Sequence, residues 1–258
     1  MAEPDGTTES PGAAIVGARD PDGLAAPWPE PWLAEQVIEK LERLVLDRRR
    51  ERIAEVLGHR LDSVTLLLDE LSDPHNRAAI VRSCDAFGVQ QLHSVQSGKP
   101  FSVHHGVAAG TERWVDVNMH ATPDAAVEHL RARGFELIQT HPAGELVPHD
   151  LSELPRIALI LGNEQRGIDE VFSLAAARSV RIPMTGFVES LNVSVSAAIL
   201  LSAAVRGRAG DLPLAAKRHL YARALFWTVP RAAEVLSAFG PPGADGMTKV
   251  SNGPAATR

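Results

Sequence analysis

The chain has 258 residues, of which 45% are hydrophobic, enough for one large or two small globular domains with a real core. Its net charge of -6 is carried by the first forty residues, which hold eight acidic and two basic side chains, so the remainder is close to neutral. Near-neutrality does not exclude a nucleic-acid ligand, because phosphate binding depends on local clusters of charge.

The sequence also limits the compartment and the kind of site. The single cysteine, Cys84, excludes an intramolecular disulfide and a metal site built from several thiolates. We expect no membrane insertion and no export, since there is neither a run of about 20 apolar residues nor a basic segment followed by an apolar one. A cytoplasmic protein is predicted, because a single cysteine fits a reducing compartment. No metal is predicted, because His104 and His105, as adjacent residues on a strand, would point to opposite sides.

The composition divides the chain into three parts. Residues 1–30 and 241–258 are crowded with Pro, Gly and Ala and are predicted to be a disordered acidic arm and a disordered tail. Over residues 31–240, apolar runs of strand length alternate with helical patterns. This alternation predicts an α/β domain with a mostly parallel sheet flanked by helices.

The predicted elements follow one another along the domain. They begin with a helix over Trp32–Leu57, a strand at Val64–Leu68, a helix over Arg77–Phe87, and strands at Leu92–Val95 and Val115–Val117. These are followed by a helix after Pro123, strands at Phe135–Thr140, Ile157–Leu161 and Val180–Ile182, a helix over Leu191–Val205, and one or two helices over Leu214–Phe239.

The first segment that carries chemistry is SDPHNRAAIVRSCDAFG, residues 72–88. Asn76 can serve as the N-cap of the helix, and Gly88 is placed to end it in the left-handed conformation. Arg82 lies about 200° around the helix from the apolar Ile80, so core packing does not explain it. The two polar residues are therefore either a cap and a surface cation or parts of a site.

The second segment is ALILGNEQRGIDEVF, residues 158–172. Gly162 follows an apolar strand and would let the backbone approach a ligand at the carboxyl edge of the sheet, beside Glu164. The glycine spacing is that of a P-loop, but Ile168 and Asp169 stand where Lys and Ser/Thr would be needed. The sequence contains no G-x-G-x-x-G, which argues against a Rossmann dinucleotide site.

The third segment is RIPMTGFVESLNVSVSAAILL, residues 181–201. Ser190 or Asn192 opens a helix whose apolar residues nearly encircle it. We therefore expect Ser190, Leu191 and Asn192 to lie deep in the protein, where free N–H groups suit an acceptor-rich ligand. Ser190 could equally be a simple cap.

In this order and spacing, the three segments resemble the motifs of the SPOUT superfamily of RNA methyltransferases, most closely the TrmH-type tRNA guanosine 2′-O-methyltransferases. The matching stretches are HNRAAIVRSCDAFGV, LGNEQRGI and IPMTGFVESLNVSVSAAILL, and a weaker resemblance extends from about Arg48 to Phe239. The resemblance implies a C-terminal deep trefoil knot, a homodimer, S-adenosyl-L-methionine as cofactor and tRNA as partner. By position, it implies that the cofactor contacts backbone groups of Thr140, Gly162, Ile182, Met184 and Leu191.

The resemblance also assigns the catalytic residues, which are Asn76, Arg82, Glu164, Ser190 and Asn192. The ribose 2′-hydroxyl must lose a proton as it attacks the methyl group. Arg82 would accept that proton, although deprotonating a guanidinium at pH 7 costs roughly 7–8 kcal/mol; alternatively, it stays cationic and stabilises the developing alkoxide. Asn76 would orient Arg82 or the ribose, Glu164 would steady the loops, and Ser190 with Asn192 would shape the pocket.

Two basic clusters are candidates for phosphate contacts, although each could equally be a solvated helix face. Their residues are Arg48, Arg49, Arg50 and Arg52 in the first cluster and Lys217, Arg218 and Arg223 in the second.

The favoured substrate is guanosine 18 in the D-loop of tRNA. Ribosomal RNA 2′-O-methyltransferases of the superfamily often carry an RNA-binding domain before the catalytic one, and the N-terminal arm is too short and polar for that. A non-catalytic RNA-binding protein with this fold is the other alternative. It would be expected to have lost Asn76, Arg82 or Asn192, and all three are present.

Overall fold

A computed structural model describes residues 24–95 and 110–240 of the chain. The strands are β1 (Val64–Asp69), β2 (Gln91–Val95), β3 (Asp116–His120), β4 (Glu136–Thr140), β5 (Ile157–Leu161) and β6 (Arg178–Val180). The α-helices are α1 (Ala34–Leu41), α2 (Asp47–Gly58), α3 (Pro74–Ala86), α5 (Pro123–Ala132), α6 (Glu170–Ala175), α7 (Val193–Ala204), α8 (Leu214–Thr228) and α9 (Ala232–Ala238). Short 3-10 helices are η1 (Glu42–Leu44), η2 (Thr111–Arg113) and η3 (Pro148–Glu153). The histidines at 104 and 105 lie outside the described residues.

The described strands form one parallel sheet in the order β3-β2-β1-β5-β4-β6. Helices α3 and α7 cover one face, where Leu66 and Leu68 pack with Ile80 and Leu200. Helices α5 and α6 cover the other face around Leu67. The central strands β1 and β5 are mostly apolar because both of their faces are buried. The predicted α/β fold with a mostly parallel sheet is confirmed.

The helix predicted over Trp32–Leu57 is interrupted. Helix α1 ends at Leu41, η1 follows, and Val45 adopts an extended conformation with φ -110° and ψ 129° before α2 begins. The bend buries Val45 in the apolar cluster of the terminal helices and leaves Leu46 82% exposed. The sequence has a continuous helical pattern here, but the chain bends because Val45 packs into the apolar cluster of the terminal helices.

The start of α3 also differs from the prediction. Asp73 is the N-cap, because its side chain accepts a hydrogen bond from the His75 N–H, and Pro74 occupies the first helical turn. Asn76 is therefore inside the helix and does not cap it. The predicted end is confirmed, since Gly88 has a φ of +75°.

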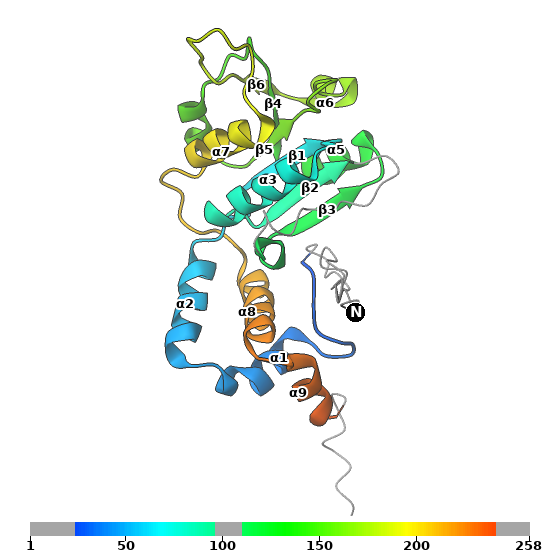
Figure 1. The fold of residues 1–258 in the computed structure, drawn as a ribbon, viewed down its shortest axis with the longest axis vertical. Coiled ribbons are helices and arrows are strands. Elements are labelled where there is room, and N and C mark those ends of the chain that lie inside the picture. The colour runs from blue at the N-terminus through cyan, green and yellow to red at the C-terminus, as the bar shows by residue number, and fades with distance from the viewer. Residues whose placement is uncertain (1–23, 96–109, 241–258) are drawn as a thin grey trace, which may run out of the picture.

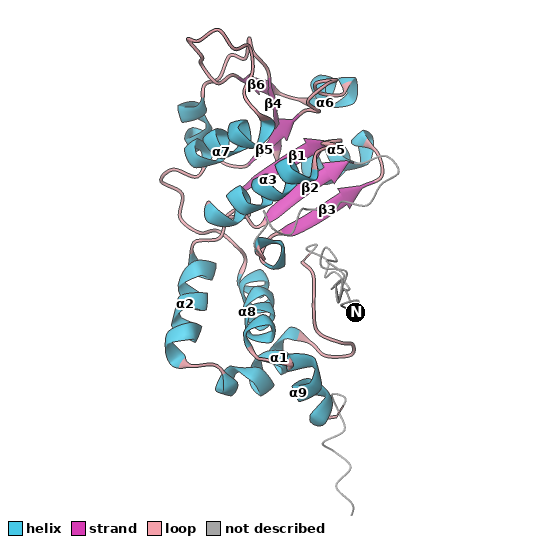
Figure 2. Ribbon diagram, viewed as in Figure 1, coloured by secondary structure: helices cyan, strands magenta, loops and turns pink. Residues whose placement is uncertain are grey.

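A second layer of helices is built from both ends of the domain. Figures 1 and 2 show α1, α2, α8 and α9 grouped on one side of the α/β part. Their shared core includes Trp28, Trp32, Val37, Leu41, Leu225 and Leu236. The region Leu214–Phe239 thus forms two helices within this layer.

The boundary of the N-terminal arm needs a correction. Leu24, Ala25 and Trp28 are buried, and the Ala25 N–H donates to Asp116 Oδ1 at 2.9 Å. These residues belong to the folded protein because their apolar side chains fill the space beside α8. The prediction that the disordered arm extends to residue 30 is therefore wrong for residues 24–30, while residues 1–23 and 241–258 lie outside the described part.

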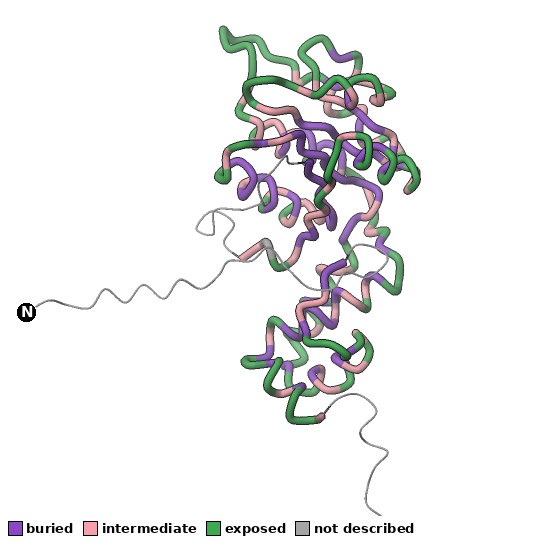
Figure 3. Tube along the Cα trace, turned by 90° about the vertical axis from the view of Figure 1, so that its right-hand side faces the viewer, coloured by how far each residue is buried: buried purple, intermediate pink, exposed green. Residues whose placement is uncertain are grey.

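Burial follows these layers, with the sheet and the facing sides of its helices buried and the loops beyond β4 and β6 largely exposed (Figure 3). Among the described residues, none of the helices has the length and apolar character required to cross a bilayer.

Candidate functional site

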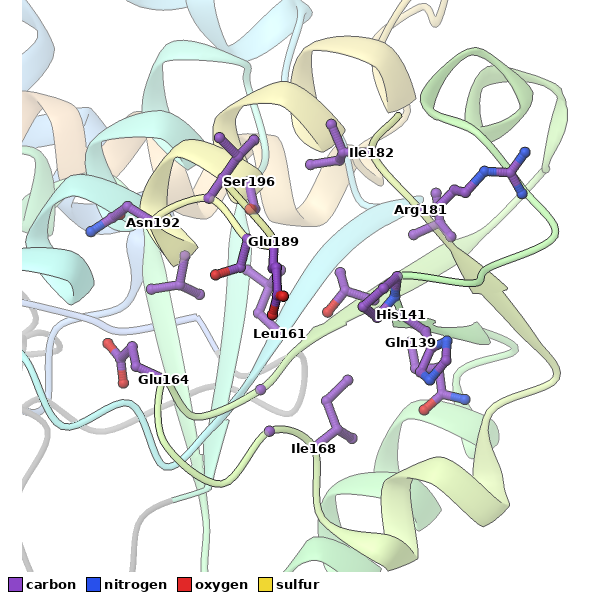
Figure 4. Close-up of a pocket in the computed structure, with 18 of the residues that line it drawn as sticks. Gln139, His141, Leu161, Glu164, Ile168, Arg181, Ile182, Glu189, Asn192 and Ser196 are labelled. Carbon is purple, nitrogen blue, oxygen red and sulfur yellow. The ribbon is translucent and has the colours of Figure 1, made fainter. Parts of the chain in front are cut away.

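A cavity of about 920 Å³ lies at the carboxyl ends of β4, β5 and β6 (Figure 4). Three loops enclose it, which follow β4 at residues 139–142, β5 at residues 161–168 and β6 at residues 180–193. Parallel α/β sheets commonly bind small molecules at this edge, where the ends of neighbouring strands diverge. The sequence prediction for the place of the site agrees with this position.

The five residues predicted to contact the cofactor all line this one cavity. They are Thr140, Gly162, Ile182, Met184 and Leu191. Thr140 is held at the end of β4 because its hydroxyl donates to the Ile160 carbonyl at 3.1 Å. Their contact with a cofactor stays a prediction, but residues far apart in the sequence are brought to one place.

The loop after β5 is a tight turn. The N–H groups of Asn163 and Gly167 each donate to the other residue's carbonyl, at 2.8 and 2.9 Å. A Cβ on Gly162 would lie 2.6 Å from the Gly167 backbone, so a larger residue cannot stand at position 162. The glycine thus permits a close approach within the loop itself, whereas the sequence had suggested an approach to a ligand. Gly167 has a φ of +75°, which favours glycine.

Asp69 anchors the far end of this loop and was not singled out in the sequence. It ends β1, and its Oδ2 accepts a hydrogen bond from the Asp169 N–H at 2.7 Å. Burial raises the pKa of this carboxyl group above its ordinary value. The available signal was an acidic residue at the end of a mostly apolar strand, a position at the same edge of the sheet.

The three sequence segments are joined by a relay of side-chain hydrogen bonds. Asn76 Nδ2 donates to Glu164 Oε1 at 2.9 Å, and Asn192 Nδ2 donates to Asn76 Oδ1 at 3.0 Å. Asn192 also caps α7, because its Oδ1 accepts from the Ser194 N–H at 2.8 Å. Glu164 and Asn192 line the cavity, so the relay fixes its rim across α3, the β5 loop and α7.

The remaining two predicted catalytic residues are arranged differently. Ser190 lines the cavity, whereas Arg82 is an exposed residue of α3 and does not line it. Arg82 lies six residues after Asn76, which is about 9 Å along the helix axis. In the part of the chain that the structure describes, Arg82 forms neither a hydrogen bond nor an ion pair, so its guanidinium can meet an external ligand.

The residues just before α7 are less buried than the sequence predicted. Ser190 and Asn192 are exposed and Leu191 is half-buried, so the expectation that all three lie deep in the protein is wrong for a single chain. The reason is that one side of α7 has no cover, as Val195 is 46% exposed. Met184, Phe187 and Val188, in the loop before this helix, are exposed as well.

The chain around β6 is enclosed on both edges. Strand β6 pairs with β4 on one side. On the other side, the Leu146 N–H donates to the Ser179 carbonyl at 3.0 Å, and the Leu146 carbonyl accepts from the Arg181 N–H at 2.9 Å. Gly144 packs so closely that a Cβ would lie 2.6 Å from the Val180 backbone. Residues 141–146 therefore pass over the end of β6, just before the chain turns into the cavity loop.

The predicted phosphate contacts divide into exposed and buried residues. On α2, Arg48 and Arg49 are exposed, while Arg50 and Arg52 form surface ion pairs with Asp47 and Glu55.

On α8, Lys217 is half-buried and Arg218 pairs with Glu35 at the surface. Arg223 is only 1% exposed and forms two hydrogen bonds with Asp116, at 3.1 and 2.8 Å. The prediction of a surface phosphate contact at Arg223 is wrong, because this side chain joins α8 to the sheet.

The lining of the cavity suits S-adenosylmethionine. Leu161, Ile168 and Ile182 present apolar side chains toward it, and Glu164 and Glu189 add carboxylates (Figure 4). An adenine ring can pack on the apolar group, the backbone groups of the loops can recognise its edge, and carboxylates favour the positively charged part of the molecule. No group of three or more metal-ligating side chains occurs among the described residues.

The sequence profile of the SpoU rRNA Methylase family matches residues 63–202. The chain belongs to this family. The predicted TrmH-type SPOUT relationship is thereby confirmed, and so are the enzyme class, an RNA 2′-O-methyltransferase, and its cofactor, S-adenosylmethionine.

Individual relatives are similar over most of their own length. The tRNA (guanosine(18)-2′-O)-methyltransferase of Escherichia coli strain K12 is 36% identical over 161 residues, which are 62% of this chain and 70% of the relative. The enzyme of the same name from Thermus thermophilus is 36% identical over 165 residues, 63% of this chain and 84% of the relative.

Solved structures are similar as well. The TrmH/SpoU tRNA modifying enzyme of A. aeolicus aligns with a TM-score of 0.64 and 28% identity, covering 72% of this chain and 98% of that one. An AdoMet-bound rRNA methyltransferase from Sinorhizobium meliloti aligns with a TM-score of 0.51 and 27% identity over 60% of this chain and 59% of that one.

Proposed function

We propose that the protein methylates the ribose 2′-hydroxyl of guanosine 18 in tRNA. The observation that carries the proposal is the relay from Glu164 through Asn76 to Asn192, at the rim of the cavity that the predicted cofactor residues line. The substrate follows from the names of relatives at 36% identity and from an A. aeolicus tRNA modifying enzyme that aligns over 98% of its length. A tRNA substrate implies work in the cytoplasm.

In this proposal, backbone groups of Thr140, Gly162, Ile182, Met184 and Leu191 hold S-adenosylmethionine. When bound, this cofactor supplies an electrophilic methyl group. The relay fixes the rim of the cavity, so that the ribose meets a site whose donors and acceptors are already oriented. Ser190 and Asn192 shape the pocket at the start of α7, and Glu164 steadies the loop after β5 through Asn76.

Arg82 acts on the 2′-hydroxyl in one of two ways. It takes the proton from the attacking hydroxyl, or it remains a cation that stabilises the developing alkoxide. Both roles need a guanidinium that is free of partners in the protein, as Arg82 is among the described residues. Both also need the RNA to bring its ribose between Arg82 and the cavity.

Two further features are part of the proposal. The passage of residues 141–146 over the end of β6 supports a C-terminal trefoil knot, because the chain from β6 into α7 would then run through a closed loop. The exposed apolar residues Phe187 and Val195 beside the cavity support a homodimer, in which a second copy covers this face. Such a partner would also bury Ser190, Leu191 and Asn192 at the start of α7.

The alternative substrate is ribosomal RNA, which is favoured by the family's name and by the similarity to the S. meliloti enzyme. The terminal helices favour tRNA. The alignment with the A. aeolicus tRNA modifying enzyme covers 72% of this chain, which is more than the residues 63–202 matched by the family profile, so it extends into the segments that form these helices.

The decisive experiment measures methyl transfer from labelled S-adenosylmethionine to unmodified tRNA and to ribosomal RNA, with the methylated nucleotide mapped by mass spectrometry. The proposal expects 2′-O-methylguanosine at position 18 of tRNA. Labelling of ribosomal RNA alone would establish the alternative, and RNA binding without transfer would indicate a non-catalytic protein.

The role of Arg82 is tested by Arg82→Ala. We expect turnover to fall at least ~100-fold, as is typical when one electrostatic stabiliser of a transition state is removed, with cofactor affinity nearly unchanged. Arg231→Ala is the matched control, since Arg231 is exposed in the terminal helices and, among the described residues, forms an ion pair with Glu234 alone. Near wild-type turnover in Arg82→Ala would contradict the proposed role.

A further inference from the structure

A second pocket lies at the opposite edge of the sheet, between α2, α8 and the amino ends of β2 and β3. Its volume is about 210 Å³, smaller than the 300–1,000 Å³ typical of sites for whole drug-sized ligands. Apolar side chains form its walls, including Ile53, Val56, Leu57, Trp114, Leu220 and Ala224. The size and the walls suit one planar ring system.

The polar residues of this pocket are buried and incompletely paired. Arg60, Gln90 and Arg223 are 4%, 0% and 1% exposed, and all three line it. Within the described part of the chain, Arg60 Nη1, Gln90 Oε1 and Arg223 Nε have no hydrogen-bond partner. Leaving buried polar atoms unpaired is costly, and these two donors and one acceptor belong to residues that line one pocket. A ligand that enters deeply enough to reach them would satisfy them through a complementary edge.

The rest of each side chain is fixed in place. Gln90 Nε2 donates to the Trp114 carbonyl at 2.9 Å and to Asp116 Oδ2 at 2.8 Å. Arg223 is held by the same Asp116, and Arg60 pairs with Asp85. The unpaired atoms are therefore preorganised, because the network around them prevents the side chains from turning toward other partners.

The opening of the pocket is basic. Arg49 and Arg52 line it and are exposed, and Arg52 is in a surface ion pair with Glu55. Helix α3 connects this pocket to the cofactor cavity, because Asn76 belongs to the relay at the cavity rim and Asp85 lines the second pocket, about 13 Å further along the helix. Arg82, exposed and free, lies between them, so a polyanion that follows α3 would meet both sites.

We propose that this pocket is a second RNA subsite, which takes one unstacked base of the substrate RNA while Arg49 and Arg52 contact the neighbouring phosphates. The inference rests on the proposed function in that the ligand is RNA. A base has a flat apolar face for the walls and an edge on which donors and acceptors alternate, which the atoms of Arg60, Gln90 and Arg223 can pair. Proteins commonly recognise single-stranded RNA through such splayed-out bases.

The test fills the pocket and measures RNA binding. Val56→Phe fills the space proposed for the base with an aromatic ring from α2. Ala224→Leu fills part of the same space with a smaller, aliphatic side chain from α8 on the opposite side. We expect either variant to raise the Kd for tRNA about tenfold or more, as loss of one stacked base does, while kcat and cofactor affinity stay unchanged. Ala215→Phe is the matched control, because Ala215 is an exposed residue of α8 that does not line the pocket.

A second measurement identifies the base. tRNA transcripts with single abasic nucleotides should lose affinity for the wild-type protein at one position outside the methylated nucleotide, and Val56→Phe should show no further loss there, as expected when two changes remove one interaction. If folded Val56→Phe and Ala224→Leu both bind tRNA as tightly as the wild type, the subsite does not exist. Methyl transfer by the wild type is measured separately, so failure of the subsite and failure of the proposed function give different results.

Discussion

The Arg223 side chain connects α8 to the sheet through a buried ion pair with Asp116. Removing one partner of such a pair leaves the other charge buried without compensation. We expect Arg223→Met to lower the free energy of unfolding by about 3–5 kcal/mol, measured by urea denaturation. Arg218→Ala, which breaks an exposed pair on the same helix, should leave the unfolding curve unchanged. Equal curves for both variants would contradict the structural role of Arg223.

Asn192 has two tasks, since it caps α7 and hydrogen bonds to Asn76. Asn192→Ala should reduce kcat by roughly 100-fold, because a rim residue that orients the site is lost, and cost about 1 kcal/mol of stability through the lost cap. Ser194→Ala is the control, as it keeps the bond between Asn192 and Asn76. An Asn192→Ala variant with normal kcat but lower stability would reduce Asn192 to a cap.

At the level of single residues, the sequence identified Asn76, Glu164 and Asn192 as polar residues of one site, but not the hydrogen bonds between them. Asn76 looked like a cap because it precedes an apolar helical run, and the structure gives that role to Asp73. Arg223 looked like a surface cation because its buried partner, Asp116, lies 107 residues away. Local spacing contains no information about a partner on another element.

Three histidines pack together between β2, β3 and α5. The rings of His93, His120 and His129 have centroids 5.2–5.3 Å apart. Burial lowers the pKa of His120 from 6.5 to about 4, and burial also lowers the pKa of His129. These elements therefore pack best when the imidazoles of His120 and His129 are neutral.

This cluster predicts a loss of stability in mild acid. Because the folded pKa of His120 is lowered, its contribution is complete above about pH 6.5 and disappears as the pH falls toward 4, where unfolding takes up about one more proton. The melting temperature should fall over that range, and less steeply in His120→Asn. His149→Asn, at an exposed position, should follow the wild type. Parallel curves for His120→Asn and wild type would exclude His120 as the cause.

The elements themselves were predicted well where periodicity and burial coincide. The strands at Val64 and Ile157 are buried along their whole length, and apolar apart from Thr65 and Asp69, because they are central in a covered sheet. The bend at Val45 was missed, because it depends on how the terminal helices pack and not on any turn residue.

The terminal helices depend on a segment that composition alone had excluded from the fold. Trp28 is 7% exposed, its Nε1 donates to the Trp32 carbonyl at 2.8 Å, and its ring packs against His219. We expect Trp28→Ala to cost about 3–5 kcal/mol in urea denaturation, because it empties the core of the helical layer. Trp227→Ala, at a position 36% exposed, should cost clearly less. A Trp28→Ala variant as stable as wild type would show that residues 24–30 do not support the fold.

The whole molecule was predictable as an α/β methyltransferase, since three motifs and their order carried the resemblance. The helices of its second layer were predicted, but the part that residues 24–30 play in that layer was not, because Pro- and Gly-rich composition hid the buried Leu24 and Trp28. The exposure of one side of α7 was also not predicted, because a helix with apolar residues on most of its sides is expected to be buried on most sides.

Helices α1 and α8 lie against each other although about 180 residues separate them. While the protein is being made, Val37, Ile38 and Leu41 emerge from the ribosome long before Leu225 and Leu236 exist to cover them. At ordinary rates of about 5–20 residues per second, this apolar surface waits for many seconds. We therefore expect the nascent chain to bind chaperones until its last helices have been synthesised.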